Sequence, residues 1–399
     1  MTSLRTVFAD LHVHIGSSDR GEAVKISASR NLTFRSIARE ASERKGVELV
    51  GVIDCHSPAV QEDIAACLES GEMEEAAGGG IRYRNTVILL GCELEVMEPG
   101  GGPFHLLAYL PTIDAMRGWT AWMMPRMKNV RLSSQRIRAT AGEVQRELLA
   151  RGGVLVPAHI FTPHRGLLGC SADRVADRLD PAGVAAVELG LSADTEMASG
   201  LSQLDSFPFL TNSDAHSTGM IGRECNELRL AEPTFEEWVR ALRGEGGRGI
   251  AANIGLHPQL GKYHTTYCAA CKTPVGSETA DVCPHCGSAR IVRGVSGRVG
   301  ELTDRNDPEA AVAGRPPYRG QVPLSFFPGV GPKMREKLLA ELGTEMNVLH
   351  RASPGELERA AGTRLAELIM AAREGTLSFE PGSGGKYGAI AVSAGGRRA

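Results

Sequence analysis

Short apolar runs alternate with helical patterns through residues 1–255, and this alternation restricts the chain to a few fold classes. The runs are rich in Val, Ile, Leu and Phe and predict strands at residues 7–11, 49–53, 87–90, 104–110, 154–156, 184–189, 209–210 and 250–254. Apolar residues at three- and four-residue spacing predict helices at residues 34–45, 60–68, 134–150, 172–179 and 235–242. This order predicts an α/β fold with a parallel sheet, open or closed as a barrel.

Residues that bind metal ions recur at or just beyond the ends of the predicted strands. In chain order they are Asp10, His12, His14, Asp19, Asp54, His56, Glu93, His105, His159, Asp214 and His216. Barrel enzymes build their active sites at the carboxyl ends of the strands. A structural role is the simpler explanation for any single histidine, but it does not explain the shared position. Imidazoles and carboxylates in this number can hold two or three divalent ions, which predicts a polynuclear metal hydrolase.

The length and composition indicate how many domains accompany the predicted sheet and in which compartment the protein is expected. A chain of 399 residues has room for roughly two to three domains. Its start lacks an apolar signal segment, and nowhere do ~18 uncharged apolar residues run together, so we expect a cytoplasmic protein without a membrane partner. Nine cysteines, an odd number, favour metal binding over a disulfide framework. Five of them are most simply interpreted as small buried hydrophobes: Cys55, Cys67, Cys92, Cys170 and Cys225.

The remaining four cysteines form two pairs typical of a zinc ribbon. Cys268 and Cys271 are separated from Cys283 and Cys286 by residues 272–282. Four thiolates complete a tetrahedral shell, so we expect a structural Zn²⁺ that holds together a domain at residues 256–302. His285 lies between ligands and is expected to be exposed.

The C-terminal part has features of a DNA-binding domain. A linker rich in Asp, Gly and Pro is expected at residues 303–323, followed by a helical domain at residues 324–399 that ends in a Gly-rich tail, part of which we expect to be mobile. Gly329 and Gly331 precede Lys333 and a helix, as in a helix-hairpin-helix, whose backbone N–H groups hold a DNA phosphate. A plain turn is the alternative.

A basic stretch in the barrel is a second candidate DNA contact. It comprises Arg126, Lys128, Arg131, Arg136 and Arg138, and it is flanked by Trp119 and Trp122. The cations could bind phosphates while an aromatic ring stacks on a base. A solvated helix face with buried tryptophans is the alternative. Arg223 and the pair His164-Arg165 follow strand ends and are weaker candidates for a phosphate contact.

The ligand series resembles that of the polymerase and histidinol phosphatase (PHP) superfamily, whose fold is a distorted β/α barrel with a trinuclear metal site. Four further segments resemble one member of it, endonuclease Q: residues 157–163, 189–194, 209–217 and 222–224, which read PAHIFTP, LGLSAD, FLTNSDAHS and GRE. The LSSQR of the basic stretch, the cysteine pairs and the hairpin are similar to it too. Proteins of this family nick DNA on the 5′ side of a deaminated or missing base.

The resemblance also implies a set of ligands. It would place one metal ion on His12, His14, Glu93 and Asp214. Glu93 would bridge to a second ion on His105 and His159, and a third ion would bind Asp19, His56 and His216. Cys55 separates Asp54 from His56 here, whereas superfamily members often have the two side by side, so Asp54 is the alternative to His56.

Clustered divalent ions suit the hydrolysis of a phosphodiester, because they activate a water molecule, neutralise the phosphate and assist the leaving group. We expect a water between two ions as the nucleophile, with Glu93, Asp214 and His216 as the catalytic residues. Zn²⁺ fits these ligands better than Mg²⁺, although Mg²⁺ or Mn²⁺ is possible. The expected substrate is DNA with hypoxanthine, uracil, xanthine or an abasic site, cut to a 3′-hydroxyl and a 5′-phosphate. The alternatives are a phosphoesterase for small phosphate esters and a less specific DNA nuclease.

A segment in the linker resembles a peptide that docks on bacterial sliding clamps. It runs from Gln321 to Phe327, with Leu324 and Phe326 at the matching positions. The alternative is a linker whose apolar side chains pack into the helical domain. We expect a monomer that associates with the nucleoid when it acts on DNA.

Overall fold

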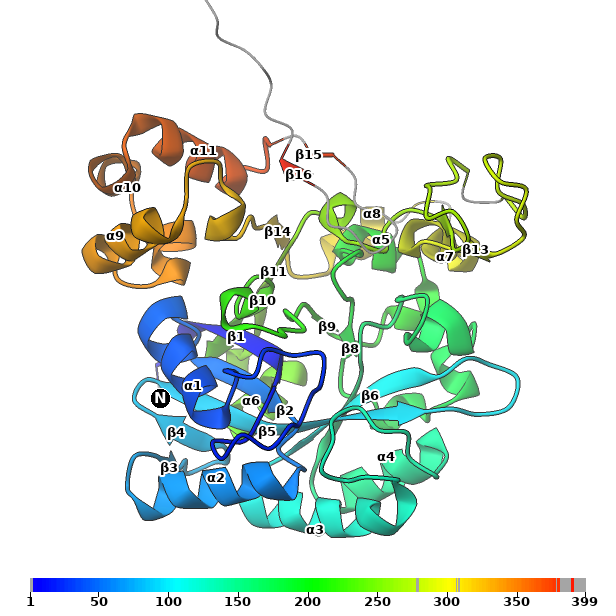
Figure 1. Ribbon diagram of the computed structural model, residues 1–399, viewed down its shortest axis with the longest axis horizontal. Coiled ribbons are helices and arrows are strands. Elements are labelled where there is room, and N and C mark those ends of the chain that lie inside the picture. The colour runs from blue at the N-terminus through cyan, green and yellow to red at the C-terminus, as the bar shows by residue number, and fades with distance from the viewer. Residues whose placement is uncertain are drawn as a thin grey trace, which may run out of the picture.

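The computed structural model describes residues 3–277, 280–305, 307, 309–377, 379–380 and 389–390. A ten-stranded mixed sheet forms its centre (Figure 1). Its strands are β1 (Arg5–His14), β2 (Leu49–Ile53), β3 (Glu74–Glu75), β4 (Ile81–Tyr83), β5 (Thr86–Val96), β6 (Phe104–Leu110), β7 (Val154–Pro157), β10 (Cys225–Leu230), β11 (Gly249–Gly255) and β14 (Tyr318–Gly320). The order is β14-β11-β10-β1-β2-β5-β4-β3, and β6 pairs with both β5 and β7.

The strand directions only partly match the predicted parallel sheet. Strands β1, β2 and β5 are parallel neighbours, as expected. The prediction is wrong for β6, which is antiparallel to β5 and β7. Strand β10, which the sequence analysis did not predict, is antiparallel to β1. The chain passes from β5 to β6 through residues 97–103. That connection is too short for the crossover that a parallel pair needs.

The ring of strands closes irregularly through two short strands, β8 (Val187–Glu188) and β9 (Phe209–Leu210), which are parallel to each other. The N–H of Ala185, just before β8, donates to the carbonyl of Leu155 in β7 at 3.0 Å. On the other side, the Leu11 N–H of β1 donates to the side chain of Asn212 at 3.0 Å. Side-chain bonds therefore replace part of a regular ladder, and the predicted distorted β/α barrel is confirmed.

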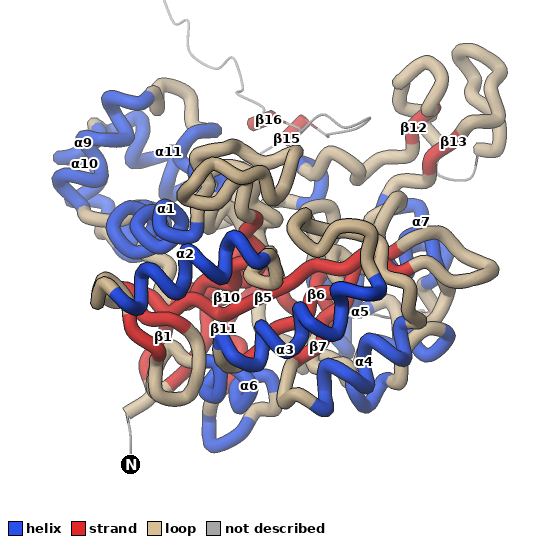
Figure 2. Tube along the Cα trace, turned by 60° about the horizontal axis from the view of Figure 1, so that its bottom comes forward, coloured by secondary structure: helices blue, strands red, loops and turns tan. Residues whose placement is uncertain are grey.

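Helices pack on the sheet, and Figure 2 shows α2, α3 and α4 along one side of it. They are α1 (Phe34–Arg39), which continues as a π-helix through Glu40–Lys45, α2 (Pro58–Glu69), α3 (Ile113–Met123), α4 (Ala141–Ala150), α5 (Thr195–Ser199) and α6 (Phe235–Leu242). The helix predicted at residues 134–150 begins only at Ala141, because Thr140 and Glu143 form a capping box there. The segment predicted at residues 172–179 forms only a short 3₁₀ turn, Val175–Asp177. Within the described residues, no helix has the length and apolar character needed to cross a bilayer.

The C-terminal parts lie on the same side of the barrel in Figure 1, with the helical domain apart from the cysteine module. The cysteine module contains β12 (Tyr267–Cys268), β13 (Ile291–Val292) and α7 (Val295–Leu302), and the helical domain contains α9 (Pro332–Leu342), α10 (Pro354–Ala361) and α11 (Thr363–Arg373). The predicted linker carries α8 (Glu309–Ala313) and β14, which extends the sheet beside β11. Most of the Gly-rich tail lies outside the described residues. Two described segments near it, β15 (Phe379–Glu380) and β16 (Ala389–Ile390), pair with each other.

The segment that resembles a clamp-binding peptide packs between the barrel and the helical domain. Gln321, Leu324 and Phe327 are all buried. The Gln321 amide donates to the carbonyl of Gly222 at 2.6 Å and contacts Nε2 of His350 at 2.5 Å. These contacts agree with the alternative in which the linker packs against the helical domain.

Candidate metal centre

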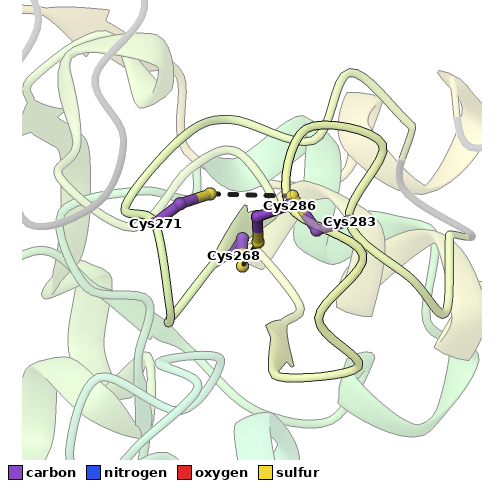
Figure 3. Close-up of side chains that lie close together, drawn as sticks. All are labelled: Cys268, Cys271, Cys283 and Cys286. Carbon is purple, nitrogen blue, oxygen red and sulfur yellow. Dashed lines mark hydrogen bonds between the residues drawn. The ribbon is translucent and has the colours of Figure 1, made fainter.

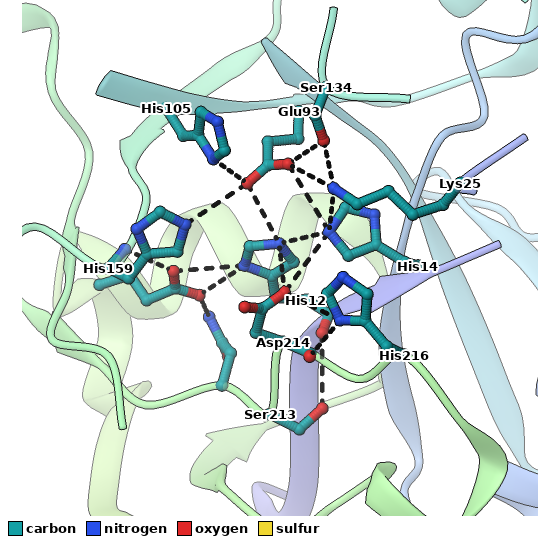
Figure 4. Close-up of polar contacts among 12 residues, drawn as sticks. His12, His14, Lys25, Glu93, His105, Ser134, His159, Ser213, Asp214 and His216 are labelled. Carbon is teal, nitrogen blue, oxygen red and sulfur yellow. Dashed lines mark hydrogen bonds and ion pairs between the residues drawn. The ribbon is translucent and has the colours of Figure 1, made fainter. Parts of the chain in front are cut away.

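Five strands bring their candidate ligand residues to one edge of the barrel (Figure 4). His12 and His14 lie on β1, Glu93 on β5 and His105 on β6, while His159, Asp214 and His216 follow β7 and β9. Because β6 is antiparallel to β5, its first residues lie where β5 ends, and His105 pairs with Glu95 in the ladder. His105 therefore reaches the same edge as the residues that follow parallel strands.

The first group of ligand atoms has the spacing of one coordination shell. His12 Nε2 and His14 Nε2 lie 3.2 Å apart, and they lie 3.6 and 3.4 Å from Asp214 Oδ1. Their distances to the carboxylate of Glu93 are 3.7 and 3.6 Å. Ligand atoms about 2.0–2.2 Å from a shared ion lie about 2.9–3.6 Å apart. The geometry and the donor types therefore fit a divalent ion at this position.

Two further groups share members with the first. Glu93 Oε1 lies 2.7 Å from His105 Nδ1 and 3.5 Å from His159 Nε2. His14, Asp214 and His216 form the other group, with His216 Nδ1 3.6 Å from Asp214 Oδ1. Glu93 is common to two groups, so its carboxylate can bridge two ions.

Two buried carboxylates hold the first histidines in the orientation that metal binding requires. Glu188 Oε1 lies 3.0 Å from Nδ1 of His12, and Asp54 Oδ2 lies 3.0 Å from Nδ1 of His14. A carboxylate on Nδ1 favours the tautomer that leaves Nε2 free to bind metal and raises its basicity. Sequence reasoning missed Glu188, although it lies at the end of the strand predicted at residues 184–189, as several ligands do.

The structure does not bring Asp19 and His56 into these groups. The Asp19 carboxylate forms an ion pair with Arg35. His56 is buried, and its Nε2 lies 3.4 Å from the carbonyl of Leu132. Among the described residues, neither belongs to a set of three potential ligands. Asp54 is also outside these sets and contacts His14 instead.

A lysine that the sequence did not single out lies beside the ligands. Lys25 Nζ is 3.2 Å from Glu93 Oε2 and 3.5 Å from His14 Nε2, and it also hydrogen-bonds to Ser134. Burial lowers the pKa of Lys25, but attraction to nearby carboxylates, that of Glu93 above all, outweighs this effect and raises the pKa. The side chain therefore carries a positive charge at the centre. It lies in an irregular loop without a motif, so no sequence signal pointed to it.

The carboxylates of the site stay ionised, as metal ligands must. Burial raises the pKa of Asp214, but attraction to His12 and a hydrogen bond with His14 hold that pKa well below its usual range. Burial raises the pKa of Glu93 in the same way, and His105 and Lys25 more than offset the increase. Both side chains can therefore bind cations over the whole physiological pH range.

The backbone is strained at the same place. Six non-glycine residues of the described chain have a positive φ, and four of them belong to the site: Asp54 (105°), Ser134 (51°), His159 (28°) and Asp214 (46°). Such conformations cost of order 1–3 kcal/mol each and persist where the surrounding structure enforces them, often at functional sites. The surroundings therefore fix the directions of these side chains.

The loop that carries Asp214 is anchored from both sides. Asp10, which is fully buried, accepts the N–H groups of Ser213 at 3.0 Å and Gly222 at 2.8 Å. Arg223, predicted as a DNA contact, is only 6% exposed and donates to the carbonyl of Ser213 from Nε and Nη2. These contacts suit bracing of the loop.

A cavity of about 280 Å³ opens onto the ligands. It is lined by side chains of the metal groups, including His105, His159, Asp214 and His216, and by Lys25, Arg165 and Tyr263. Tyr263 belongs to the segment that leads into the cysteine module. The cavity therefore lies between the barrel and that module.

Beyond Arg126, the basic stretch is irregular and not helical as far as α4. Trp119 is fully buried, and its ring stacks on that of Trp122 at 4.9 Å. Arg126 lies 4.5 Å above the Trp122 ring. The tryptophans thus agree with the alternative of a packing role, whereas Lys128, Arg131 and Arg136 are exposed.

The four cysteines meet in the module after the barrel (Figure 3). The Sγ atoms of Cys268 and Cys286 lie 3.6 Å apart, as do those of Cys271 and Cys283. Thiolates on a tetrahedral Zn²⁺ lie about 3.8 Å apart, so the spacing fits that ion. His285 is exposed, as expected, and is outside the group.

The hairpin residues are accessible at the start of α9. Gly331 is the N-cap of that helix and Lys333 lies in its first turn. Gly329 has a φ of 88°, a conformation that glycine adopts readily. All three residues are exposed.

Comparison with known proteins gives consistent matches. A family model described as "PHP-associated" matches residues 196–245. The "Uncharacterized protein YqxK" of Bacillus subtilis (strain 168) is 48% identical over 390 residues, which cover 97% of this chain and 100% of that protein. The crystal structure of the "novel lesion-specific endonuclease PfuEndoQ" from Pyrococcus furiosus is 31% identical and superposes with a TM-score of 0.84, covering 98% of this chain and 96% of that one.

A second solved structure is of endonuclease Q in complex with a 27-mer duplex substrate that has an abasic lesion at the active site. It is 31% identical, has a TM-score of 0.83, and covers 98% of this chain and 97% of that one. The match includes the barrel, the cysteine module and the helical domain, and it confirms the resemblance seen in the sequence. The chain therefore belongs to the endonuclease Q family.

Proposed function

We propose that this protein is a metal-dependent DNA repair endonuclease. It hydrolyses the phosphodiester 5′ to a deaminated base or an abasic site and leaves a 3′-hydroxyl and a 5′-phosphate. The observation that carries the proposal is the match over 98% of the chain to a family member bound to lesion-containing duplex DNA. The three groups of potential metal ligands at one cavity supply chemistry suited to that reaction.

The distances between the side chains support the following set of ligands. His12, His14, Glu93 and Asp214 would hold one ion, and Glu93 would share a second with His105 and His159. His216 would complete a third position with His14 and Asp214. Asp19 and His56 are left out of this set, and Asp54 and Glu188 orient the histidines. Bound Zn²⁺, or Mn²⁺ or Mg²⁺, would neutralise the phosphate and supply an activated water.

Residues of the chain itself supply further charge at the cut. Lys25 lines the cavity with its ammonium 3.2 Å from Glu93, within reach of an oxygen of a phosphodiester held at the ligands. The positive charge of Lys25 would stabilise the additional negative charge that develops on the phosphate during hydrolysis. Glu93 and Asp214 stay ionised, so they remain ligands throughout the reaction.

Selection of lesions would follow from extrusion of the nucleotide into the cavity. Unpaired and mispaired nucleotides cost less to unstack than paired ones, so abasic sites, hypoxanthine, uracil and xanthine are favoured. The exposed glycines at the start of α9 and the cysteine module would bind the backbone without reading sequence. We expect a monomer in the cytoplasm that acts on the nucleoid.

The test uses duplexes with one deoxyinosine, deoxyuridine, deoxyxanthosine or abasic site, together with an undamaged duplex. Each is incubated with purified protein and Mg²⁺, Mn²⁺ or Zn²⁺, and with chelator as a control. Nicking only of lesion strands, and only with metal, supports the proposal. Equal nicking of undamaged DNA would leave a less specific nuclease, and release of phosphate from small monoesters without nicking would favour the phosphoesterase.

A further inference from the structure

Two exposed arginines from different loops share one largely buried carboxylate beside the metal centre. Arg136 Nε lies 2.7 Å from Glu95 Oε1, and Arg165 Nε lies 3.1 Å from Glu95 Oε2. The Glu95 side chain is 11% exposed, whereas those of Arg136 and Arg165 are 53% and 44% exposed. A guanidinium has five N–H donors, so each arginine keeps most of its donors for another acceptor.

The charges at this point do not balance. One carboxylate neutralises one of the two guanidinium groups, and the other leaves a net positive charge. Two cations held on the same carboxylate also repel each other, and a second anion between or beside them relieves that repulsion. The planar, forked donors of arginine suit a phosphate in particular.

Glu95 places this positive charge close to the potential metal ligands. Glu95 lies two residues after Glu93 on β5, so both side chains point to the same face, about 6.6 Å apart along the strand. Across the ladder, Glu95 pairs with His105. A phosphate held by the two arginines on Glu95 would therefore lie next to one held at the potential ligands.

Backbone hydrogen bonds fix both arginine loops to this strand pair. Glu95 N–H donates to Gln135 at 3.2 Å, and Ile137 N–H donates back to Glu95 at 3.0 Å, on either side of Arg136. His105 N–H donates to the carbonyl of Arg165 at 2.9 Å. Arg165 also lines the cavity. These hydrogen bonds therefore fix the backbone positions of the two arginines relative to the potential metal ligands.

We propose that Arg136 and Arg165 together bind one phosphate of the cut strand, next to the phosphodiester that lies at the metal centre. Glu95 is a positioning residue that holds the two guanidinium groups in one phosphate-binding unit. The inference rests on the proposed function, because its ligand is the DNA backbone. The unit would set the register of the strand, so that the linkage beside the lesion lies over the ligands.

The test compares Arg136→Ala, Arg165→Ala and the double variant with the wild type. Arg117→Ala is the matched control, because Arg117 is an exposed arginine paired with Asp114 on α3. Binding to a duplex with one abasic site is measured over a range of salt concentrations with Ca²⁺ as the added ion. Thermal unfolding and metal content show whether each variant is folded.

If both arginines bind one phosphate, the double variant reduces the magnitude of the negative slope of log affinity against log salt by about 0.9, and each single variant has nearly the full effect. A tenfold rise in salt then weakens the wild type about eightfold more than the double variant. A slope equal to that of the wild type overturns the proposal. A loss of about 1.8, additive over the two single variants, overturns the shared phosphate, because it indicates two separate contacts.

Two further measurements identify the phosphate and the role of Glu95. A neutral methylphosphonate next to the cut should weaken binding by the wild type but not by the double variant, and an equal effect on both overturns the proposal. Glu95→Gln adds one positive charge, so it strengthens binding if the arginines act only through charge. We expect weaker binding, because the guanidinium groups lose their shared anchor.

If an arginine variant fails to fold, binding by the wild type alone decides the case. A methylphosphonate at the linkage next to the cut should then weaken binding more than one at a distant linkage, and equal weakening overturns the proposal. Failure of the wild type to nick lesion DNA would refute the proposed function. Normal nicking by the wild type, with a double variant that binds and nicks identically, would refute only the phosphate-binding unit.

Discussion

Replacement of Glu188 by glutamine should weaken metal binding, although Glu188 belongs to none of the ligand groups. Its buried carboxylate lies 3.0 Å from His12 Nδ1, 2.7 Å from the His159 N–H and 2.8 Å from the Asn212 side-chain amide. Glutamine keeps the volume but offers one acceptor oxygen and an NH₂ group. At least one of the three donors must then face another donor.

The size of the effect follows from two independent considerations. A buried donor without an acceptor costs about 1–3 kcal/mol. Loss of a partner that orients a metal-binding histidine typically reduces metal affinity or activity about 10–100-fold, which corresponds to about 1.4–2.8 kcal/mol. The two ranges overlap. We therefore expect the metal concentration that gives half-maximal nicking to rise about 10–100-fold, while Zn²⁺ on the cysteines is unaffected.

The assay is a titration of metal-depleted protein with Mn²⁺ or Zn²⁺, followed by bound metal and by nicking of an abasic duplex. Glu237→Gln on α6 is the matched control, because the side chain of that glutamate is also largely buried and pairs with Arg248, and Glu237 is outside the ligand groups of the described residues. Wild-type metal affinity in a folded Glu188→Gln variant would refute the orienting role. A loss of stability without any change in metal affinity would do the same.

Three more predictions concern other parts of the chain. Burial raises the pKa of Glu224 from 4.5 to about 8, so the folded protein keeps a proton that the unfolded chain has released, and stability falls as the pH rises between these values. Glu224→Gln should therefore raise Tm relative to the wild type, by a margin that grows from pH 5 to pH 9. A margin that does not change with pH would contradict this. Cys283→Ser should remove the zinc of the module and weaken DNA binding while the barrel keeps its metals, as measured by metal content and binding; full zinc content would argue against the four-cysteine site. Gln321→Ala leaves Gly222 and His350 without their partner and should lower the free energy of unfolding by about 1–3 kcal/mol in denaturant titrations, whereas an unchanged value would show that the contacts are dispensable.

Patterns that repeat along the chain were sufficient to predict the barrel and most of the residues that meet in the groups of potential ligands. Alternation along β1 places Val7, Ala9 and Leu11 in the core and points His12 and His14 the other way. Periodicity could not give the direction of β6, because direction depends on connection length and on pairing, and β10 was not predicted as a strand.

The rest of the site depends on tertiary contacts that a single sequence does not display. Glu188 and Lys25 act on residues far away in the chain, and neither belongs to a motif with regular spacing. Asp19 fits the expected order of ligands, yet a nearby arginine pairs with it in the folded chain. Arg223 looks like a surface cation but binds a carbonyl inside its own loop. Order along the chain predicts candidate ligands, and only the fold shows which of them meet.

The position and chemistry of the cut on lesion DNA test the central claim most directly. A duplex with a single deoxyinosine, labelled on either strand, is incubated with the wild type and with Asp214→Asn, and the product ends are mapped at single-nucleotide resolution. We predict one metal-dependent nick 5′ to the lesion, with a 3′-hydroxyl and a 5′-phosphate, and a loss of nicking in the variant. A cut elsewhere, or full activity of Asp214→Asn at normal metal content, would contradict the account.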